Sequence, residues 1–505
     1  MLRPDYKQLL ENIKAELDPA QIAQAEATAE RLYEELPHKD ELEKNRVVVL
    51  LGGGKDSTWM TSYTRLVQLL IWDKPGHHTF TLRALTGRHP GMQHEVMKNI
   101  DRTYKALGMY DDPLAETIVV HNDRSEKFDP NMAMPDDVLR LNRTDVLMNG
   151  HRYAAEGRGT FCNACNNNLM KWIAAGAADD GGADILITGD SLNEQGAYSN
   201  WIGRSAHDFG VNVKPLKPLP QFQRTLSKGN LIAQEHAAII HGHDSQAIKE
   251  RSIDTDFPKK TKLFSVFSEG EATYSARDHM PFLTDFLHFD FNSLMFSFTE
   301  TDCGNPALMA HLYGLAAEKL FGASYADGVR EYRDYAIELM KTKEFPDELV
   351  EAMSDRYKDD AAITEMRKKV EQYAWDAYRL DATQLTAMVY APFASQGANL
   401  HRFIQDEHAD LLGEEDHIHA LLRGEHHPGD KELSERLEAI CGLTLKQLQQ
   451  TYVSALVRNP LDKNHETDDL GGKLILLRNY DPHQAMIYSR LNSEGVEQRQ
   501  LITGR

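Results

Sequence analysis

Short apolar runs alternate with longer amphipathic stretches in the first part of the chain. The runs with the length and β-branched character of buried strands are 47–51, 79–86, 116–121 and 183–188. Between them, apolar residues recur at helical spacing, most clearly after residue 58 and over 92–107 and 162–178. Strands that are separated by helices predict an α/β fold with a doubly wound parallel sheet, whose ligand lies at the carboxyl ends of the strands.

Two segments of this part do not follow the alternation. Residues 123–160 are polar and irregular, which predicts an insertion or a lid over the site. Residues 211–219, VNVKPLKPL, predict an edge strand, because proline lacks an N–H donor and is tolerated mainly at sheet edges.

From about residue 222 onward, long charged helical stretches dominate. They are Glu235–Ile248, Asn305–Leu320, Asp327–Lys341, Asp347–Leu380 and Lys431–Arg458. We expect the boundary between Pro220 and Asp254. The predicted organisation is an N-terminal helical segment (1–45), an α/β domain (46–222) and a mainly α-helical C-terminal region (223–505).

The turn after the first strand carries the strongest chemical signal. It reads, in order, Gly52, Gly53, Gly54, Lys55, Asp56, Ser57. Glycines let backbone N–H groups approach an anion, the following helix N-terminus favours negative charge, and Lys55 adds a positive charge. The turn has neither the Walker spacing nor the last glycine of the dinucleotide fingerprint. A Gly-rich turn without a ligand is the alternative, but Lys-Asp-Ser after such a strand favours a nucleotide phosphate.

Composition and charge disfavour several classes of protein and of binding partner. The 505-residue chain has a net charge of −21, which disfavours a polyanion such as nucleic acid unless a local basic face exists. No apolar run approaches the roughly 20 residues of a membrane span, and the charged N-terminus is not a secretion signal. Four cysteines in a chain of this length do not form a disulfide framework, so a cytoplasmic location is expected.

The cysteines give the second chemical signal. Cys162 and Cys165 open a predicted helix at a spacing that lets two thiols converge on one centre. Cys303 lies in a compact polar string, whereas Cys441 lies in a helical stretch and is predicted to be core. Three thiols could hold an iron–sulfur cluster, the pair could bind zinc or act as a redox dithiol, or the cysteines could be structural. The His-rich segment Asp416–His427 could add ligands, although surface histidine runs are mostly solvated.

The glycine turn resembles the PP-loop, Ser-Gly-Gly-x-Asp-Ser, of the ATP pyrophosphatase superfamily. Gly53, Gly54, Asp56 and Ser57 match position for position, and Gly52 replaces the usual serine. The resemblance implies a Rossmann-like PP-loop domain that splits ATP into AMP and pyrophosphate and places AMP on a substrate oxygen. It also implies that ATP is held by the segment from Gly52 to Ser57, with Lys55 on the pyrophosphate and Asp56 on Mg²⁺.

The stretch from Cys162 to about residue 201 is similar to the PP-loop sulfurtransferases that thiolate tRNA. In that group a Cys-x-x-Cys opens a helix, a later cysteine completes a [4Fe-4S] site, and the next strand ends near the nucleotide. The resemblance assigns Cys162, Cys165 and Cys303 as cluster ligands. It places Gly189 beside the nucleotide and Asp190 as an acid that orients metal or substrate. Cys303 lies farther downstream than is usual, and no tRNA-binding domain is recognised ahead of the loop.

The sequence therefore predicts ATP-dependent adenylation of a carbonyl oxygen followed by sulfur transfer, with ATP, Mg²⁺ and a [4Fe-4S] cluster. One alternative is a PP-loop amidotransferase or ligase that inserts nitrogen, similar to 7-cyano-7-deazaguanine synthases or sugar amidotransferases, with structural or Zn²⁺-bound cysteines. Another is a non-catalytic nucleotide-binding subunit of a larger assembly. The expected partners are a small-molecule or tRNA acceptor, with the small molecule favoured by charge, a sulfur-donor protein and a second copy of the chain, but no membrane.

Overall fold

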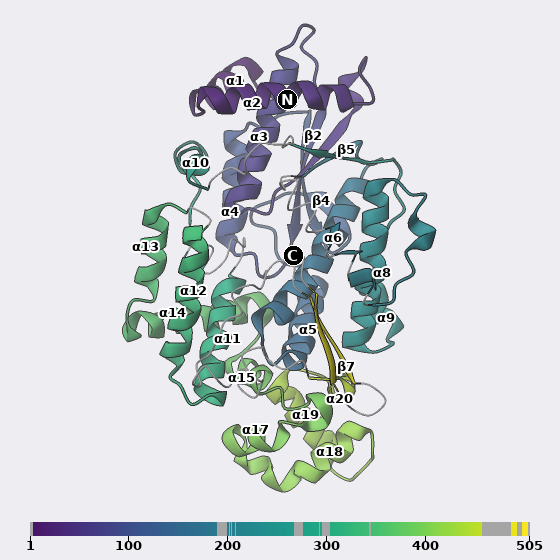
Figure 1. Ribbon diagram of the computed structural model, residues 1–505, viewed down its shortest axis with the longest axis vertical. Coiled ribbons are helices and arrows are strands. Elements are labelled where there is room, and N and C mark those ends of the chain that lie inside the picture. Colours follow the sequence, from purple (N-terminus) through teal and green to yellow (C-terminus); the bar gives the residue numbers. More distant parts are fainter. Residues whose placement is uncertain are drawn as a thin grey trace.

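The computed structural model is dominated by a central sheet with helices on both faces and a helical region beyond its carboxyl edge (Figure 1). It describes residues 4–188, 199–200, 202–203, 205–207, 209–266, 276–291, 293–294, 304–342, 345–456, 486–491 and 497–502.

The sheet has six strands in the order β4-β3-β2-β1-β5-β6. The strands are β1 (Arg46–Leu50), β2 (Thr81–Arg88), β3 (Ala115–His121), β4 (Arg124–Lys127), β5 (Ile185–Thr188) and β6 (Lys262–Ser265). All neighbours are parallel except β3 and β4, which form an antiparallel pair. The predicted α/β fold is confirmed. The sheet is predicted to be parallel and is mostly so, with β4 as the antiparallel exception, and β6 joins it from beyond residue 222.

Side chains of β1 alternate between two helical layers because successive residues of a strand point to opposite faces. Val47 and Val49 pack in the core that includes α1 (Tyr6–Ala15), α2 (Pro19–Glu35), α3 (Lys55–Trp72) and α4 (His94–Ala106). Val48 packs instead in the core formed with α6 (Asn163–Ala178) and α8 (Gln221–His241). The sheet is thus covered on both faces, which explains the continuous apolar run of its central strand.

The segment 123–160 is more regular than its polar sequence predicts. It forms β4, then α5 (Asp136–Arg152), then a π-helical turn (Arg158–Cys162). Helix α5 is buried along much of its length, and polar residues such as Asp145, Asn149 and His151 occupy buried positions. The expected irregularity of this segment is wrong. Polar residues occupy the buried face of α5, for example Asp145 in contact with Arg251, so the sequence of this helix shows no apolar period.

The predicted edge strand at 211–219 is also wrong. The segment contains a 3₁₀ turn, Lys214–Leu216, and α8 then begins at Gln221. Pro215, Pro218 and Pro220 cannot donate to a sheet ladder, which favours a turn over an edge strand here.

The C-terminal region is mainly helical, as predicted. Its helices are α9 (Ser245–Arg251), α10 (Ala276–Pro281), α11 (Asn305–Leu320), α12 (Tyr325–Thr342), α13 (Asp347–Arg356), α14 (Asp360–Tyr378), α15 (Ala382–Tyr390), α16 (Ala394–Gly397), α17 (Leu400–Glu407), α18 (Glu415–Arg423), α19 (Asp430–Cys441) and α20 (Leu445–Val453). Shorter elements are the π-turn Phe282–Phe286, the 3₁₀ turns Leu42–Lys44 and Ala409–Glu414, and the hairpin strands β7 (Met486–Leu491) and β8 (Glu497–Ile502). Helices α11 to α15 and α17 to α20 share a separate hydrophobic core, to which α5 also contributes.

Several stretches that the apolar pattern predicts as single helices are divided into shorter helices in the structure. The stretch predicted as Asp347–Leu380 divides between α13 and α14, where Asp359 accepts a hydrogen bond from the backbone N–H of Ala362 as an N-cap. The stretches Glu235–Ile248 and Lys431–Arg458 are interrupted at Gly242 and Gly442, both with positive φ. Only the bounds of Asn305–Leu320 agree with the prediction at both ends.

Helix α1 is linked to the α/β domain by a hydrogen bond from Tyr6 to a buried ion pair. Arg65 Nη2 lies 2.7 Å from Asp112 Oδ2, and both side chains have 0% exposure. Tyr6 donates its hydroxyl to the same carboxylate at 2.6 Å. The pair therefore joins α1, α3 and the loop before β3.

We expect Asp112→Asn to lower the free energy of unfolding by about 3–5 kcal/mol, because it leaves the Arg65 charge buried without its partner. Urea denaturation followed by circular dichroism measures this change. Asp137→Asn is the matched control, since the Arg124–Asp137 pair is about half exposed on both sides and should contribute below about 1 kcal/mol. Equal losses for the two variants would contradict the expectation.

Candidate functional site

The glycine turn has a conformation that requires glycine at its second position. Gly53 has φ +82°, and a Cβ added there would lie 2.5 Å from Val96 Cγ1 on α4. A side chain at Gly53 would therefore both strain the backbone and collide with the helix packed against the turn. The turn is closed by Ser57, whose Oγ accepts from the N–H of Gly52 at 3.1 Å and donates to the carbonyl of Gly54 at 3.2 Å.

The turn lies where the fold places a ligand. From β1, the chain builds the sheet outward through β2 and β3 and later returns to the other side of β1 with β5. In sheets with such a reversal of strand order, ligands bind beyond the carboxyl ends of the strands on either side of it. The turn begins at Gly52, two residues after the end of β1. Gly54 is the N-cap of α3, so the positive end of the dipole of this helix lies at the turn.

Lys55 and Asp56 lie at the first turn of α3. Lys55 Nζ is 2.7 Å from both carboxylate oxygens of Asp56. The lysine side chain is 9% exposed and the aspartate 42%, so the pair has its carboxylate toward solvent. The same ammonium lies 4.8 Å from the ring centroid of Phe345, a residue of the helical region. Lys55 is thus held between its own helix and the C-terminal half of the chain.

An aromatic stack lies beside Lys55. His279 stacks on Trp59 with ring centroids 3.8 Å apart, and Phe282 meets Trp59 edge-on. Burial, followed by the positive charge of Lys55, lowers the pKa of His279 to about 3, so the ring is neutral at physiological pH. His279 is not among the predicted site residues, because nothing in the pattern around it relates it to α3.

The loop after β2 is fixed by the helical region. Tyr373 on α14 donates its hydroxyl toward the carbonyl of Gly91, at 2.9 Å, and toward Asn305 Oδ1, at 2.8 Å. Tyr378 donates to the same Asn305 oxygen at 2.8 Å. The N–H of Gly304 also lies 3.4 Å from the carbonyl of Gly91. The C-terminal half therefore closes over the carboxyl edge of the sheet.

Buried basic groups gather at the ends of β2 and β3. Arg88 is 8% exposed and donates to the carbonyl of Met132 at 2.6 Å. Burial and the charge of Arg88 lower the pKa of His89 to about 4. His121, the register partner of Arg88, has its pKa lowered chiefly by burial. None of these three residues is among the predicted site residues, although the Gly-Arg-His string directly after the second predicted strand is a sequence signal for a site at the end of that strand.

The structure describes only part of the predicted cysteine centre. Cys162 ends the π-helical turn and Cys165 lies on the first turn of α6, partly buried. Cys303, Gly189 and Asp190 lie outside the described residues. Cys441 is a buried core residue, as predicted: its thiol donates to the carbonyl of Leu437 at 2.9 Å, and burial raises its pKa to about 12.

Metal ligands do not gather elsewhere in the described part of the chain, where no group of three or more His, Cys, Asp and Glu side chains is placed to hold an ion. In the His-rich segment, His417 contacts Glu414 at 3.2 Å and Asp430 at 2.9 Å. These surface contacts raise its pKa, as expected for a histidine in ion pairs.

Searches of the sequence against models of protein families and against curated proteins, and of the structure against solved structures, found no match. None of the described helices combines the length and apolar character that crossing a membrane requires. The geometry of the site therefore carries the functional proposal.

Gly53→Ala should lower the free energy of unfolding by about 1–3 kcal/mol, because the added methyl group meets α4 and the backbone has positive φ. Thermal unfolding measures the change. Gly413→Ala is the matched control, since an added Cβ there has no atom within 4 Å. Equal stability of Gly53→Ala and the native chain would show that the close approach to Val96 is not a constraint.

Proposed function

We propose that the protein is a PP-loop ATP pyrophosphatase that adenylates a substrate carbonyl oxygen and then transfers sulfur to the activated carbon. The observation that carries the proposal is the Gly52–Ser57 turn at the reversal of strand order, with its obligatory glycine and the N-terminus of α3. A polyphosphate fits this place because backbone N–H groups and a helix dipole favour negative charge.

Lys55 and Asp56 have complementary roles in this proposal. In the structure Lys55 Nζ lies 2.7 Å from Asp56 Oδ2, and this ion pair keeps both charged groups next to the glycine turn. When Mg-ATP binds, Lys55 turns to the pyrophosphate oxygens, and Asp56 offers a hard carboxylate ligand to Mg²⁺. The carbonyl oxygen of the acceptor attacks the α-phosphorus, the bond from this phosphorus to the oxygen shared with the β-phosphate breaks, and pyrophosphate leaves with Lys55 balancing its charge. Mg²⁺ held by Asp56 would supply further stabilisation of the negative charge on this leaving group.

The resulting adenylate makes the former carbonyl oxygen a good leaving group. Attack by sulfide sulfur on the carbon then expels AMP with that oxygen. The thiolates of Cys162, Cys165 and Cys303 suit an iron–sulfur cluster, which when bound would supply a site for this sulfur. The structure supports the assignment to the extent that Cys162 and Cys165 flank the start of α6, three positions apart.

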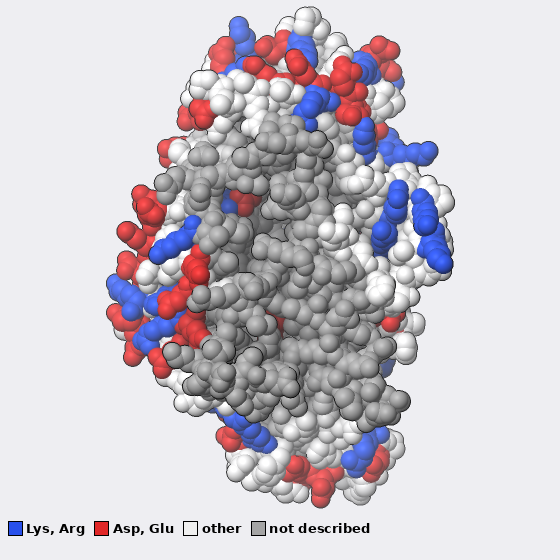
Figure 2. All heavy atoms as spheres, in the orientation of Figure 1, with Lys and Arg blue, Asp and Glu red and all other residues white. Residues whose placement is uncertain are grey.

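The proposed acceptor is a small molecule in preference to tRNA. The net charge of −21 repels a polyanion. Along the margin formed by α12 to α14 in Figure 2, Lys and Arg are interspersed with Asp and Glu. Such mixed charge does not form a continuous basic face along that margin.

Adenylation is tested by following α-labelled ATP in the presence of Mg²⁺ with cell extract as the source of acceptor. We expect AMP and pyrophosphate, and a loss of roughly 100-fold or more in Lys55→Ala and Asp56→Asn, because each removes a charge that acts on the leaving group. Asp137→Asn is the control carboxylate, remote from the turn in an exposed ion pair. Formation of ADP, or unchanged activity in Asp56→Asn, would contradict the proposal.

The sulfur step is tested by iron and sulfide analysis of protein purified without oxygen. We expect iron and acid-labile sulfide that are lost in Cys162→Ala and Cys165→Ala but kept in Cys441→Ala, whose thiol is buried and protonated. Zinc or no metal, together with AMP formation, would instead indicate nitrogen insertion. Neither metal nor turnover of ATP would indicate a nucleotide-binding subunit.

A further inference from the structure

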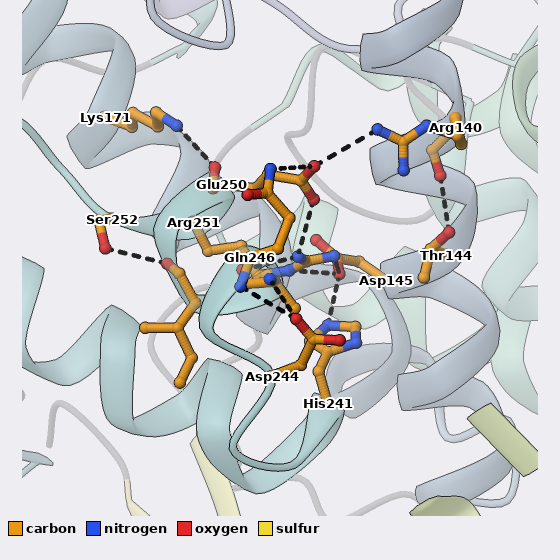
Figure 3. Close-up of polar contacts among 12 residues, drawn as sticks. Arg140, Thr144, Asp145, Lys171, His241, Asp244, Gln246, Glu250, Arg251 and Ser252 are labelled. Carbon is orange, nitrogen blue, oxygen red and sulfur yellow. Dashed lines mark hydrogen bonds and ion pairs between the residues drawn. The ribbon is translucent and has the colours of Figure 1, made fainter. Parts of the chain in front are cut away.

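A small polar pocket lies between helices α5, α6, α8 and α9, apart from the glycine turn. Its lining includes Asp145 and Asn149 from α5, Asn167 from α6, His236 and His241 from α8, and Arg251 from α9. Figure 3 shows Asp145, His241 and Arg251 pointing toward one another from these helices. The space admits a group of only a few non-hydrogen atoms.

The charges of the pocket wall are already balanced. Oδ1 of Asp145 accepts from Arg251 Nε at 2.8 Å and from His241 Nε2 at 2.9 Å, and it also contacts Arg251 Nη2 (Figure 3). Burial alone would raise the pKa of Asp145, but Arg251 and His241 lower it to about 2, so the carboxylate is ionised. The negative charge of Asp145 is therefore balanced by its partners, and a ligand of this pocket does not contact an unpaired charge there.

Three buried polar atoms in this wall have no hydrogen-bond partner among the described residues: Asn149 Oδ1, Asn167 Oδ1 and His236 Nε2. Their residues are 1%, 9% and 7% exposed, respectively. Buried polar groups in folded proteins are almost always paired, so three of them at one pocket indicate a missing partner. Each belongs to a side chain whose other polar atom is engaged, which fixes the direction of the open one.

The hydrogen-bonding sense of these atoms follows from their neighbours. Asn149 donates through Nδ2 to the backbone carbonyl of Asp145 at 2.8 Å, so Oδ1 is the open acceptor. Asn167 Nδ2 lies 3.4 Å from His236 Nδ1; an amide nitrogen is a donor, so Nδ1 accepts and the ring hydrogen is on Nε2. Burial lowers the pKa of His236 to about 3, so this ring is neutral. The wall offers two acceptors and one donor.

We propose that this pocket binds the primary carboxamide group of a small molecule. The two N–H bonds of the amide donate to Asn149 Oδ1 and Asn167 Oδ1, and its carbonyl oxygen accepts from His236 Nε2. A carboxylate of the same shape brings no donor and places negative oxygens against two carbonyl oxygens. An ammonium ion has no acceptor for the ring N–H. The site is independent of the ATP chemistry proposed above, because its residues are separate from the glycine turn.

The test uses the full chain labelled with ¹⁵N at its histidines and titrated with acetamide, sodium acetate or ammonium chloride. We expect His236 to be the Nε2–H tautomer, with ring shifts that saturate on addition of acetamide and at least about tenfold weaker responses to acetate and ammonium. Asn167→Leu should weaken the acetamide response by a similar factor. Gln234→Leu is the matched control, because this α8 amide bonds instead to Ser252 at 3.0 Å and does not line the pocket.

A crystal of the native protein soaked in acetamide provides a readout that does not depend on the variants. Amide density in contact with Asn149, Asn167 and His236 supports the proposal. Ordered water alone at these atoms, binding at crystal concentration only without a response in solution, or a preference for ammonium or acetate would overturn it.

Discussion

The close approach of α4 to the glycine turn is the constraint on which the arrangement of the site depends. Val96 and Ile100 occupy the space that a Cβ of Gly53 would need, so the turn and α4 can pack together only because residue 53 has no side chain. This packing holds Gly53 in its positive-φ conformation. The conformation of the glycine turn then fixes where α3 begins. The positions of Lys55 and Asp56 are consequences of that start.

The C-terminal helical region also contacts the surroundings of the glycine turn, through hydrogen bonds and an aromatic ring. Hydroxyl groups of Tyr373 and Tyr378 converge on Asn305, and Tyr373 also reaches the carbonyl of Gly91 after β2. Phe345 lies against the Lys55 ammonium from the same half of the chain. Bonds of this kind in a buried setting cost stability when one partner is lost, so the two halves are coupled at the carboxyl edge of the sheet. The proposed adenylation site is therefore shaped by both.

Polar side chains of α5 also connect elements that are remote in the sequence. Asp145 joins α5 to α8 and α9 through His241 and Arg251, and the ionised carboxylate is stabilised by these partners despite its burial. A buried ion pair of this type gives orientation more than net stability, because desolvation offsets much of the attraction. The unpaired Asn149, Asn167 and His236 atoms nearby then define a small space with a set direction of hydrogen bonding.

The sequence by itself determined the central strands, the glycine turn and the helical character of the C-terminal region. These features depend on local pattern: an apolar run such as Val47–Val49 forms a strand buried on both faces, and the glycines permit a backbone that other residues resist. Only the tertiary structure decided the burial of α5 and the residues that surround Lys55. Their partners are remote in the chain, as for Asp145 and Arg251, 106 positions apart, or Tyr373 and Gly91, 282 apart. Whether a polar residue lies in solvent or in the interior depends on such partners, and no local period encodes them.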